Sequence, residues 1–281
     1  MRSSLSVCHV NHVPCGKISS WWRGAAWAWL AWRVLAATTT SAAPLLSWHL
    51  VRQLPHDPLA YTEGLINTSR GLYESTGLYG ASSLRLVEPQ TGKVLQYRAL
   101  DKSLFGEGLA LVGNRLIQLT WKEGQALVYN QETLQPISHW NFLGEGWGLA
   151  YDGQALVMSD GSAWLSRRNP ATFAILGRML VRDEGHPVTQ LNELEFQDGV
   201  LWANIYMTDR IARIEPTHGT VTGYLDLQPL RERLPPPDGN APPPEVLNGI
   251  AATSQGTLLV TGKFWPTLFE IRLDSQELGR L

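Results

Sequence analysis

Runs of alternating apolar and polar residues recur along this chain, and each follows a similar short motif. Counted from the glycine of the motif, or from Glu193 in the fourth copy, the copies are 44, 40, 45 and 56 residues apart. Alternation with a period of two predicts half-buried strands, and a repeat of this length is typical of one propeller blade. The five motifs are Glu63-Gly64-Leu65, Glu107-Gly108-Leu109, Trp147-Gly148-Leu149, Glu193-Leu194-Glu195 and Asn248-Gly249-Ile250.

Turn residues separate the strand patterns inside each repeat. Residues 109–112 alternate, Gly113-Asn114 follows, and residues 115–119 alternate again. The same order returns around Asp152-Gly153 and Asp198-Gly199, and such pairs favour tight hairpins because primed turns need positive φ. No segment has sustained helical periodicity. We therefore expect an all-β fold, a five-bladed β-propeller with a central funnel, in which the glycines of the motifs let the chain turn at the funnel rim.

The longest interval between motifs contains a proline-rich segment, residues 234–244, with six prolines. Proline lacks the N–H that a central strand donates, so this segment cannot pair in a sheet. It is expected to be a loop between two blades, which accounts for the longer spacing.

Residues 1–43 differ from the rest of the chain, with four basic residues, no acidic ones and a Trp/Ala/Leu-rich run that ends in small residues. This pattern predicts an export signal, hence a periplasmic or secreted protein; a retained N-terminal membrane anchor is the alternative. The propeller would then span residues 44–281. Both cysteines, Cys8 and Cys15, lie in the leader, so thiol chemistry is excluded for the propeller.

Without the leader the chain has 19 basic and 25 acidic residues, a net charge of −6 with histidine neutral. Binding to nucleic acid or to anionic lipid needs a basic face. We therefore expect neither as a partner, and we expect a monomer without stable membrane insertion.

The innermost strands of a propeller line its channel, so residues at equivalent strand starts face one opening. Glycine and tryptophan at these places serve blade packing in many proteins, and for a single tryptophan packing is the simpler interpretation. The whole set fits that interpretation poorly, because it combines aromatic rings, carboxylates, an amide and an amine. Its members are Phe105, Glu107, Trp121, Trp147, Asn192, Glu193, Tyr206 and Lys263.

Several longer motifs surround these positions. They include His56-Asp57-Pro58, Tyr61-Thr62-Glu63-Gly64-Leu65, Phe105-Gly106-Glu107-Gly108, Leu119-Thr120-Trp121, Gly146-Trp147-Gly148-Leu149, Leu191-Asn192-Glu193-Leu194-Glu195, Leu247-Asn248-Gly249-Ile250 and Thr261-Gly262-Lys263-Phe264-Trp265-Pro266. With them, residues 54–273 resemble the plant- and bacterial-type glutaminyl-peptide cyclotransferases. The resemblance implies a five-bladed propeller and an aminoacyltransferase that converts the N-terminal glutamine of peptides or proteins to pyroglutamate with release of ammonia. The repeat count agrees independently.

The implied reaction is intramolecular: the α-amine attacks the γ-amide carbon of the same residue and ammonia leaves. One carboxylate can move the proton from the attacking to the departing nitrogen. We assign this role to Glu107, which matches the family's catalytic glutamate and whose apolar neighbours would raise its pKa by desolvation. The resemblance also implies that Asn192 and Lys263 polarise the γ-carbonyl.

The resemblance further implies an aromatic box around the glutamine side chain. Trp121, Trp147 and Tyr206 match its positions, and Tyr61 and Phe105 extend its wall. The family pattern favours Trp where Tyr206 stands and Phe where Tyr61 stands, so the two hydroxyl groups put the substrate preference in doubt.

Glu63 stands where the plant-type pattern has Gln. Its carboxylate has two open roles: it holds the substrate's α-ammonium, or it raises the pKa of Glu107. We expect at most one of Glu193 and Glu195 to face the funnel, and we interpret both as structural.

No metal motif is present, since the histidines are scattered singly. We therefore expect no required cofactor, while a structural calcium on channel carbonyls is compatible with the fold. Two other functions stay open: a non-catalytic propeller that binds peptides or a protein, and a calcium-dependent, lactonase-like propeller with Glu63, Asn192 and Asn248 as ligands.

Overall fold

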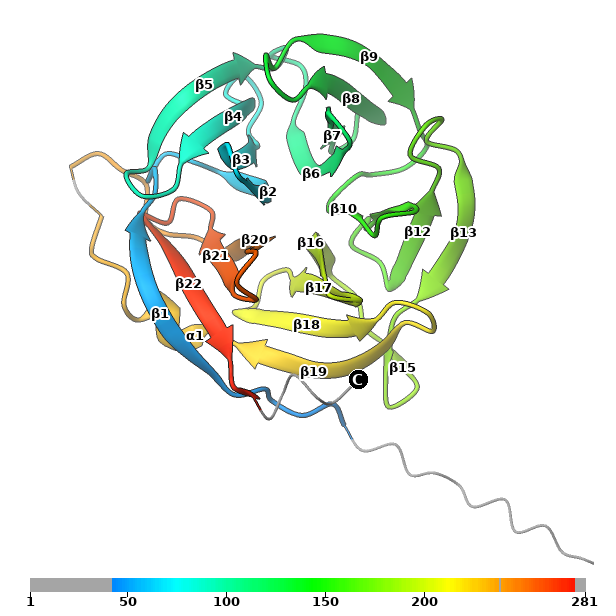
Figure 1. Ribbon diagram of the computed structural model, residues 1–281, viewed down its shortest axis with the longest axis vertical. Helices are drawn as coiled ribbons and strands as arrows, with labels where there is room; N and C mark the ends of the chain where they lie inside the picture. The colour runs from blue at the N-terminus through cyan, green and yellow to red at the C-terminus, as the bar shows by residue number, and fades with distance from the viewer. Residues whose placement is uncertain (1–41, 238, 276–281) are drawn as a thin grey trace, which may run out of the picture. The chain divides into compact units, whose positions relative to one another are not determined.

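A computed structural model describes residues 42–237 and 239–275 of the 281-residue chain. Five antiparallel sheets stand around a central axis and form a β-propeller (Figure 1). The prediction of an all-β, five-bladed fold is confirmed. The predicted leader, residues 1–43, lies almost wholly outside the described residues.

The first three blades each contain four strands that are consecutive in the sequence. Blade 1 consists of β2 (Thr62–Thr68), β3 (Gly71–Thr76), β4 (Ser83–Glu88) and β5 (Lys93–Ala99). Blade 2 consists of β6 (Gly106–Val112), β7 (Arg115–Thr120), β8 (Gln125–Asn130) and β9 (Pro136–Asn141). Blade 3 consists of β10 (Leu149–Tyr151), β11 (Leu156–Met158), β12 (Trp164–Arg168) and β13 (Ile175–Leu180).

The last two blades depart from this plan. Blade 4 consists of β16 (Leu191–Gln197), β17 (Val200–Ile205), β18 (Arg210–Glu215) and β19 (Thr220–Asp226), with the short strands β14 (Arg182–Asp183) and β15 (His186–Pro187) beyond β19. Blade 5 consists of β20 (Leu247–Ala252), β21 (Leu258–Gly262), β22 (Thr267–Leu273) and β1 (Trp48–Pro55).

The outer strand of blade 5 comes from the start of the propeller. Strand β1 pairs antiparallel with β22, from Trp48 opposite Leu273 to Pro55 opposite Thr267. This pairing joins the two ends of the described chain and closes the ring, and it covers the edge of β22. The alternation pattern did not reveal β1, because its partner lies more than two hundred residues away and no motif precedes it.

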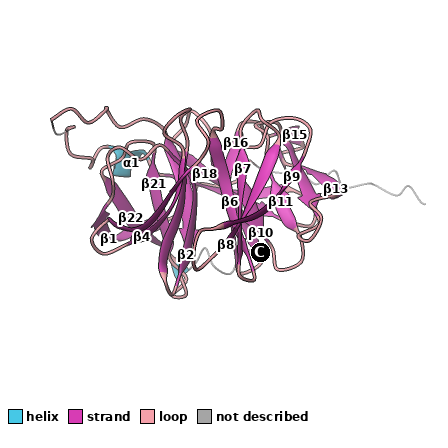
Figure 2. Ribbon diagram, turned by 90° about the horizontal axis from the view of Figure 1, so that it is seen from above, coloured by secondary structure: helices cyan, strands magenta, loops and turns pink. Residues whose placement is uncertain are grey.

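The predicted hairpins form where the turn residues indicated. Asp198 and Gly199, between β16 and β17, have φ of 50° and 82°, as a primed two-residue turn requires. Gly113, between β6 and β7, also has positive φ. The described chain contains a single helical turn, α1 (Gln228–Arg231), which the sequence did not predict and which stands out among strands and loops in Figure 2.

Residues 232–237 and 239–246 contain no strand. The prediction of a loop between two blades is therefore confirmed. The loop ends at Glu245, whose N–H donates to the carbonyl of Lys263 at 2.8 Å. Lys263 in turn donates its N–H to the carbonyl of Val246. These two bonds fix the backbone of the turn that carries Lys263.

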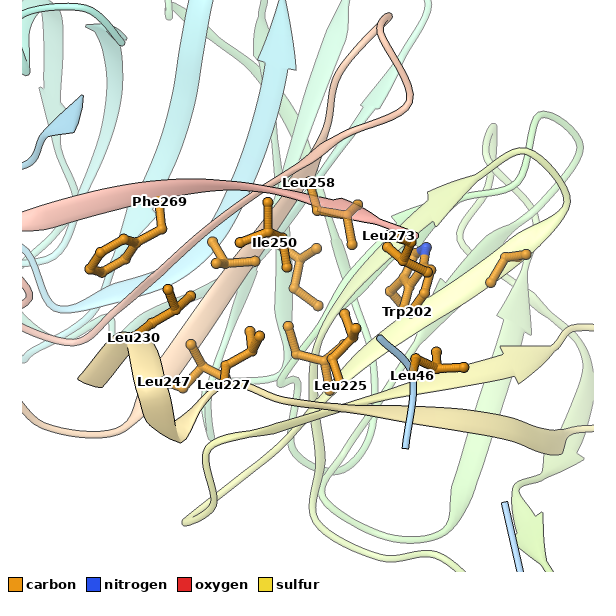
Figure 3. Close-up of a cluster of buried hydrophobic side chains, with 14 of the residues drawn as sticks. Leu46, Trp202, Leu225, Leu227, Leu230, Leu247, Ile250, Leu258, Phe269 and Leu273 are labelled. Carbon is orange, nitrogen blue, oxygen red and sulfur yellow. The ribbon is translucent and has the colours of Figure 1, made fainter. Parts of the chain in front are cut away.

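Apolar side chains between blades hold the ring together, and the largest cluster lies between blades 4 and 5. Leu225 and Trp202 from blade 4 pack there against Ile250, Phe269 and Leu273 from blade 5 (Figure 3). Leu46, at the start of the described chain, joins the same cluster. Burial of such side chains contributes about 1.5–3 kcal/mol each, so the closure by β1 is supported by core packing as well as by the strand ladder.

Candidate active site

Four of the five inner strands begin with a shared irregularity in their strand pairing. In β2, β6, β16 and β20 the pairing with the next strand shifts register near the strand start. A bulge of this kind re-aims a side chain. The register makes four polar residues equivalent: Glu63, Glu107, Asn192 and Asn248.

The same register corrects the motif of the fourth blade. Leu194 pairs with Ala203 as Leu109 pairs with Gln118, so the motif there is Asn192-Glu193-Leu194 rather than Glu193-Leu194-Glu195. Glu193 therefore stands where the other four blades have glycine.

Three of the four motif glycines serve close approach rather than turning, contrary to our expectation. A β-carbon on Gly148 would lie 2.0 Å from the carbonyl oxygen of Asn192, and one on Gly108 would lie 2.5 Å from the nitrogen of Leu149. A β-carbon on Gly64 would likewise lie too close to the backbone of blade 2. Only Gly249, with φ of 112°, has a backbone conformation that itself favours glycine. The inner strands are thus drawn together around the axis.

A cavity of about 160 Å³ opens at the rim where these strands start. This volume is well below the 300–1,000 Å³ of a typical drug-sized site, so it suits a single side chain. All nine residues that the sequence singled out for the site line it: Tyr61, Glu63, Phe105, Glu107, Trp121, Trp147, Asn192, Tyr206 and Lys263.

Glu107 reaches this cavity from β6 and is 6% exposed. Its carboxylate accepts no hydrogen bond from any residue that the structure describes, whereas its backbone carbonyl is held by the hydroxyl of Ser75. Burial raises the pKa of Glu107 well above its usual value, and the charge of Glu63 raises it further, while Lys263 opposes both. A buried carboxyl group with a raised pKa in a cavity is typical of a group that takes up and releases a proton.

Glu63 and Lys263 form a buried ion pair on the other side of the cavity. The Nζ atom of Lys263 lies 2.7 Å from Oε1 of Glu63, and Nδ2 of Asn248 donates to Oε2 at 2.9 Å. Burial raises the pKa of Glu63 to about 7 in spite of Lys263. Burial disfavours the charged form of Lys263, but Glu63 and Glu107 more than offset this and raise its pKa.

Aromatic rings form most of the remaining wall. Phe105 meets Tyr61 and Trp121 edge to face, at centroid distances of 6.1 and 5.5 Å. Trp147 and Tyr206 form a similar pair at 5.5 Å. The Nζ atom of Lys263 lies 4.4 Å from the centre of the Tyr61 ring, within cation–π range. These rings give the cavity an apolar wall with space between flat faces.

Asn192 completes the cavity from β16, and it is 3% exposed. Its backbone carbonyl accepts from the hydroxyl of Ser159 at 2.7 Å, which fixes the main chain. Its Oδ1 atom is buried and has no hydrogen-bond partner among the described residues. No described residue accepts a hydrogen bond from its Nδ2 atom either, so this N–H group is free to donate to a group that enters the cavity.

Comparisons with known proteins identify the family and match the architecture. The model of the family described as glutamine cyclotransferase matches residues 25–273. A glutaminyl-peptide cyclotransferase of Arabidopsis thaliana is 42% identical over 229 residues, which cover 80% of this chain and 70% of the relative. The chain belongs to the glutamine cyclotransferase family. The crystal structure of the glutaminyl cyclase of Myxococcus xanthus is similar to it with a TM-score of 0.76 and 38% identity, covering 83% of this chain and 98% of the other.

The sequence of this cyclotransferase family member did not reveal one residue of the site, Glu145. Oε2 of Glu145 accepts from Nε1 of Trp121 at 2.8 Å and from Nε1 of Trp147 at 3.0 Å. A single carboxylate oxygen thus sets the orientation of two indole rings of the cavity. The sequence signal for this role of Glu145 was weak, because a glutamate between Gly144 and Gly146 resembles a solvated turn residue.

Neither Glu193 nor Glu195 lines the cavity, and both carboxylates bind backbone groups of other inner strands. Glu193 accepts from the N–H of Ile250 at 2.9 Å and of Leu65 at 3.3 Å, and Glu195 accepts from the N–H of Ala252 at 2.7 Å. Residues two apart in a strand share a face, so both carboxylates point toward β20. Burial raises the pKa of both, and both bind backbone groups that adjoining inner strands leave free.

The His56-Asp57 motif belongs to a second group of buried charges, which we call the Arg85 cluster: His56, Asp57, Glu74 and Arg85. Arg85 bonds Asp57 at 2.7 Å and also bonds Glu74. Glu74 accepts from Nε2 of His56 at 2.9 Å and from the hydroxyl of Thr62 at 2.8 Å. The cluster ties β3 and β4 to the segment that enters β2.

The described residues contain no group of three or more His, Cys, Asp or Glu side chains placed to hold a metal ion. In the trio considered for a lactonase-like site, Glu63 uses one carboxylate oxygen for Lys263 and the other for Asn248. The amide nitrogen of Asn248 points at Glu63 and at the carbonyl of Thr62, both hydrogen-bond acceptors. Among the described residues there is no helix long and apolar enough to span a membrane.

Proposed function

We propose that this chain is a glutaminyl-peptide cyclotransferase, which converts the N-terminal glutamine of peptides or proteins to pyroglutamate and releases ammonia. The observation that carries the proposal is Glu107, a buried carboxyl group with a raised pKa that accepts no hydrogen bond from the described residues, inside an aromatic cavity of side-chain size. A binding module gains nothing from such a group, since an unpaired buried carboxyl destabilises the fold.

In the proposed reaction the glutamine side chain lies between the aromatic rings, with its amide turned back toward its own α-amine. The amine nitrogen attacks the γ-amide carbon, a new C–N bond forms, and the bond to the amide nitrogen breaks. Glu107 takes the proton from the attacking amine and gives it to the departing nitrogen, which leaves as ammonia. Holding the two ends of one residue together supplies much of the rate enhancement.

Lys263 and Asn192 would stabilise the negative charge that develops on the carbonyl oxygen. An ammonium has three donors, and the bond to Glu63 occupies one of those of Lys263. The side-chain amide of Asn192 lines the same cavity. Glu63 uses one oxygen for Lys263 and the other for Asn248, so its proposed role is to hold Lys263 and to raise the pKa of Glu107. No step requires a metal or other cofactor.

Purified protein incubated with a glutamine-initiated peptide tests the proposal, with ammonia release and loss of the free amine as readouts. The same peptide with an acetylated N-terminus is the control, because it has no free amine to attack. We expect both products from the first peptide, none from the second, and no effect of a chelator. Absence of turnover would contradict the enzyme assignment, and loss of turnover on chelation would favour a metal-dependent reaction.

We also infer that the protein is exported and acts outside the cytoplasm as a monomer. The inference rests on the basic and apolar pattern of residues 1–43 and on the cysteine-free propeller. N-terminal sequencing of the protein recovered outside the cytoplasm, followed by light scattering, tests it. An uncut chain retained in membranes would support the anchor instead.

A further inference from the structure

A second cavity, of about 350 Å³, lies between blades 2 and 3, which are neighbours in the ring (Figure 1). We call it the Arg168 cavity. Strands β12 and β13 of blade 3 form one side, and the end of β9 of blade 2 forms the other. Among its lining residues are Asn141, Phe142, Trp164, Ser166, Arg168 and Arg178.

Strand geometry brings two guanidinium groups to the same wall of this cavity. Trp164, Ser166 and Arg168 are two residues apart along β12, so their side chains share one face. Arg178 on β13 is the direct pairing partner of Ser166, and cross-strand partners point to the same side. Arg178 is exposed, whereas Arg168 is only 6% exposed.

Arg168 has no counter-ion among the described residues. Its Nε and Nη1 atoms reach the hydroxyl of Ser166 and the carbonyl of Phe173, each at 3.3 Å. Its guanidinium carbon lies 4.7 Å from the centre of the Phe173 ring. In the described part of the chain, neither Arg168 nor Arg178 forms an ion pair. A buried cation without a counter-ion is costly, so the wall favours an incoming anion.

Each of the two carboxylates that line the cavity has one oxygen bound to a group other than the two arginines. Oε2 of Glu145 accepts from both indoles of the candidate active site. Oδ1 of Asp160 accepts from the N–H and the hydroxyl of Ser162 at 3.0 and 2.5 Å. Burial lowers the pKa of Arg168 and the charge of Arg178 lowers it further, while Asp160 offsets only part of this.

The Arg168 cavity borders the candidate active site directly. Glu145 lines the first and bonds Trp121 and Trp147, which line the second. A β-carbon on Gly161, next to Asp160, would lie 2.7 Å from the ring of Trp147. Trp147 and Glu145 are therefore the shared wall between the two cavities.

We propose that the Arg168 cavity is a subsite for the peptide chain beyond the N-terminal glutamine, and that it takes a carboxylate of that chain. The proposal rests on the proposed function, because only a peptide substrate continues beyond the glutamine. A side-chain carboxylate of Asp or Glu and the terminal carboxylate of a short peptide offer the same chemistry. Arginine recognises either through its planar fork of donors.

Turnover of matched peptide sets by the full chain tests the subsite and distinguishes the two sources. All peptides begin with glutamine: one amidated set carries a single Glu at successive positions, a second carries Lys there, and a third is neutral with either a free or an amidated C-terminus. We expect the wild type to prefer Glu over Lys at one position by about tenfold in kcat/KM, the scale of one charge-assisted hydrogen bond. A preference for the free over the amidated C-terminus would assign the terminal carboxylate.

For each variant the readout is the ratio of kcat/KM for the Glu peptide to kcat/KM for the Lys peptide. This ratio does not depend on how much of a preparation is active. Arg178→Glu should reverse the preference for the acidic peptide, and Arg178→Gln should reduce it several-fold. Arg70→Gln is the matched control, an exposed arginine in the turn between β2 and β3 of another blade, and should leave the ratio unchanged. Two results would overturn the subsite alone. One is wild-type turnover of the peptides without any preference for a carboxylate, and the other is a ratio that Arg178→Glu leaves unchanged. Absence of turnover with every peptide would overturn the proposed function and the subsite with it.

Discussion

The Arg85 cluster and the candidate active site both bury acidic and basic side chains, and their acids behave in opposite ways. Burial alone would raise the pKa of Glu74, but Arg85 and His56 more than offset it and hold that pKa well below its usual range. Glu107 is buried as well and accepts no hydrogen bond from the described residues, so its pKa rises. The balance between burial and the positive charge paired with the group decides whether a buried carboxyl is a fixed anion or a group able to carry a proton.

The largest expected effect is the loss of turnover in Glu107→Gln. The amide keeps the size of the carboxyl group but cannot take a proton, so we expect kcat to fall by about 10²–10⁴-fold, the usual contribution of general acid–base catalysis. The free energy of unfolding should stay the same or rise, because no buried ion pair is broken. Ammonia release and urea unfolding measure the two effects, and undiminished turnover would remove Glu107 from the mechanism.

Glu74→Gln should produce the reverse pattern. It leaves Arg85 buried with one carboxylate fewer, and removal of one partner of a buried ion pair costs about 3–5 kcal/mol. Urea unfolding should show this loss, while turnover per folded molecule changes little. Glu132→Gln, at an exposed carboxyl group, is the control and should leave both unchanged. A fully stable Glu74→Gln protein would mean that the cluster does not hold blade 1 together.

A smaller effect is expected at Glu145. Its carboxylate is paired, unlike that of Glu107, but its partners are neutral indole N–H groups rather than the cations that pair with Glu74. Glu145→Leu removes the acceptor of two indole N–H groups, and we expect kcat/KM to fall roughly tenfold, mainly through KM, as two net hydrogen bonds suggest. Glu145→Gln retains an acceptor oxygen and should recover most of the loss. A variant that changes stability alone, with KM intact, would assign Glu145 a purely structural role.

The smallest expected effect is a displacement of the pH profile in Glu63→Gln. Glu107 has to be ionised to take the proton, and the negative charge of Glu63 raises its pKa. Removing that charge lowers the pKa of Glu107, so the acid limb of kcat/KM should move to lower pH. The profile from initial rates over a pH series measures this, with Glu132→Gln again as control. A limb that stays in place, or moves to higher pH, would show that Glu63 does not act on Glu107.

Much of this arrangement could be predicted from the sequence, because the blades repeat and the motifs sit at the same strand starts. The repeat indicated five blades, and the family motifs indicated the nine residues that line the cavity. Glu145 was beyond reach, since its role depends on two indole groups that the fold brings to one oxygen. Strand β1 was missed because closure pairs the two ends of the propeller.

The motif glycines and the two glutamates of β16 show a different limit. A sequence shows that glycine is present but not whether it provides positive φ or close approach, and Gly148 provides the second because the backbone of Asn192 lies against it. Glu193 and Glu195 were expected to face different ways, although residues two apart in a strand share a face. What they bind, the N–H groups of neighbouring inner strands, appears only once the strands are assembled.

The central claim is that Glu107 carries the proton because no described residue pairs with it, while Glu74 holds the fold because it is fully paired. The most direct test measures ammonia release and the free energy of unfolding on the same preparations of wild type, Glu107→Gln and Glu74→Gln. We predict a crossed pattern, in which the first variant loses turnover and keeps stability and the second loses stability and keeps turnover per folded molecule. Loss of stability in Glu107→Gln together with retained turnover would contradict the claim.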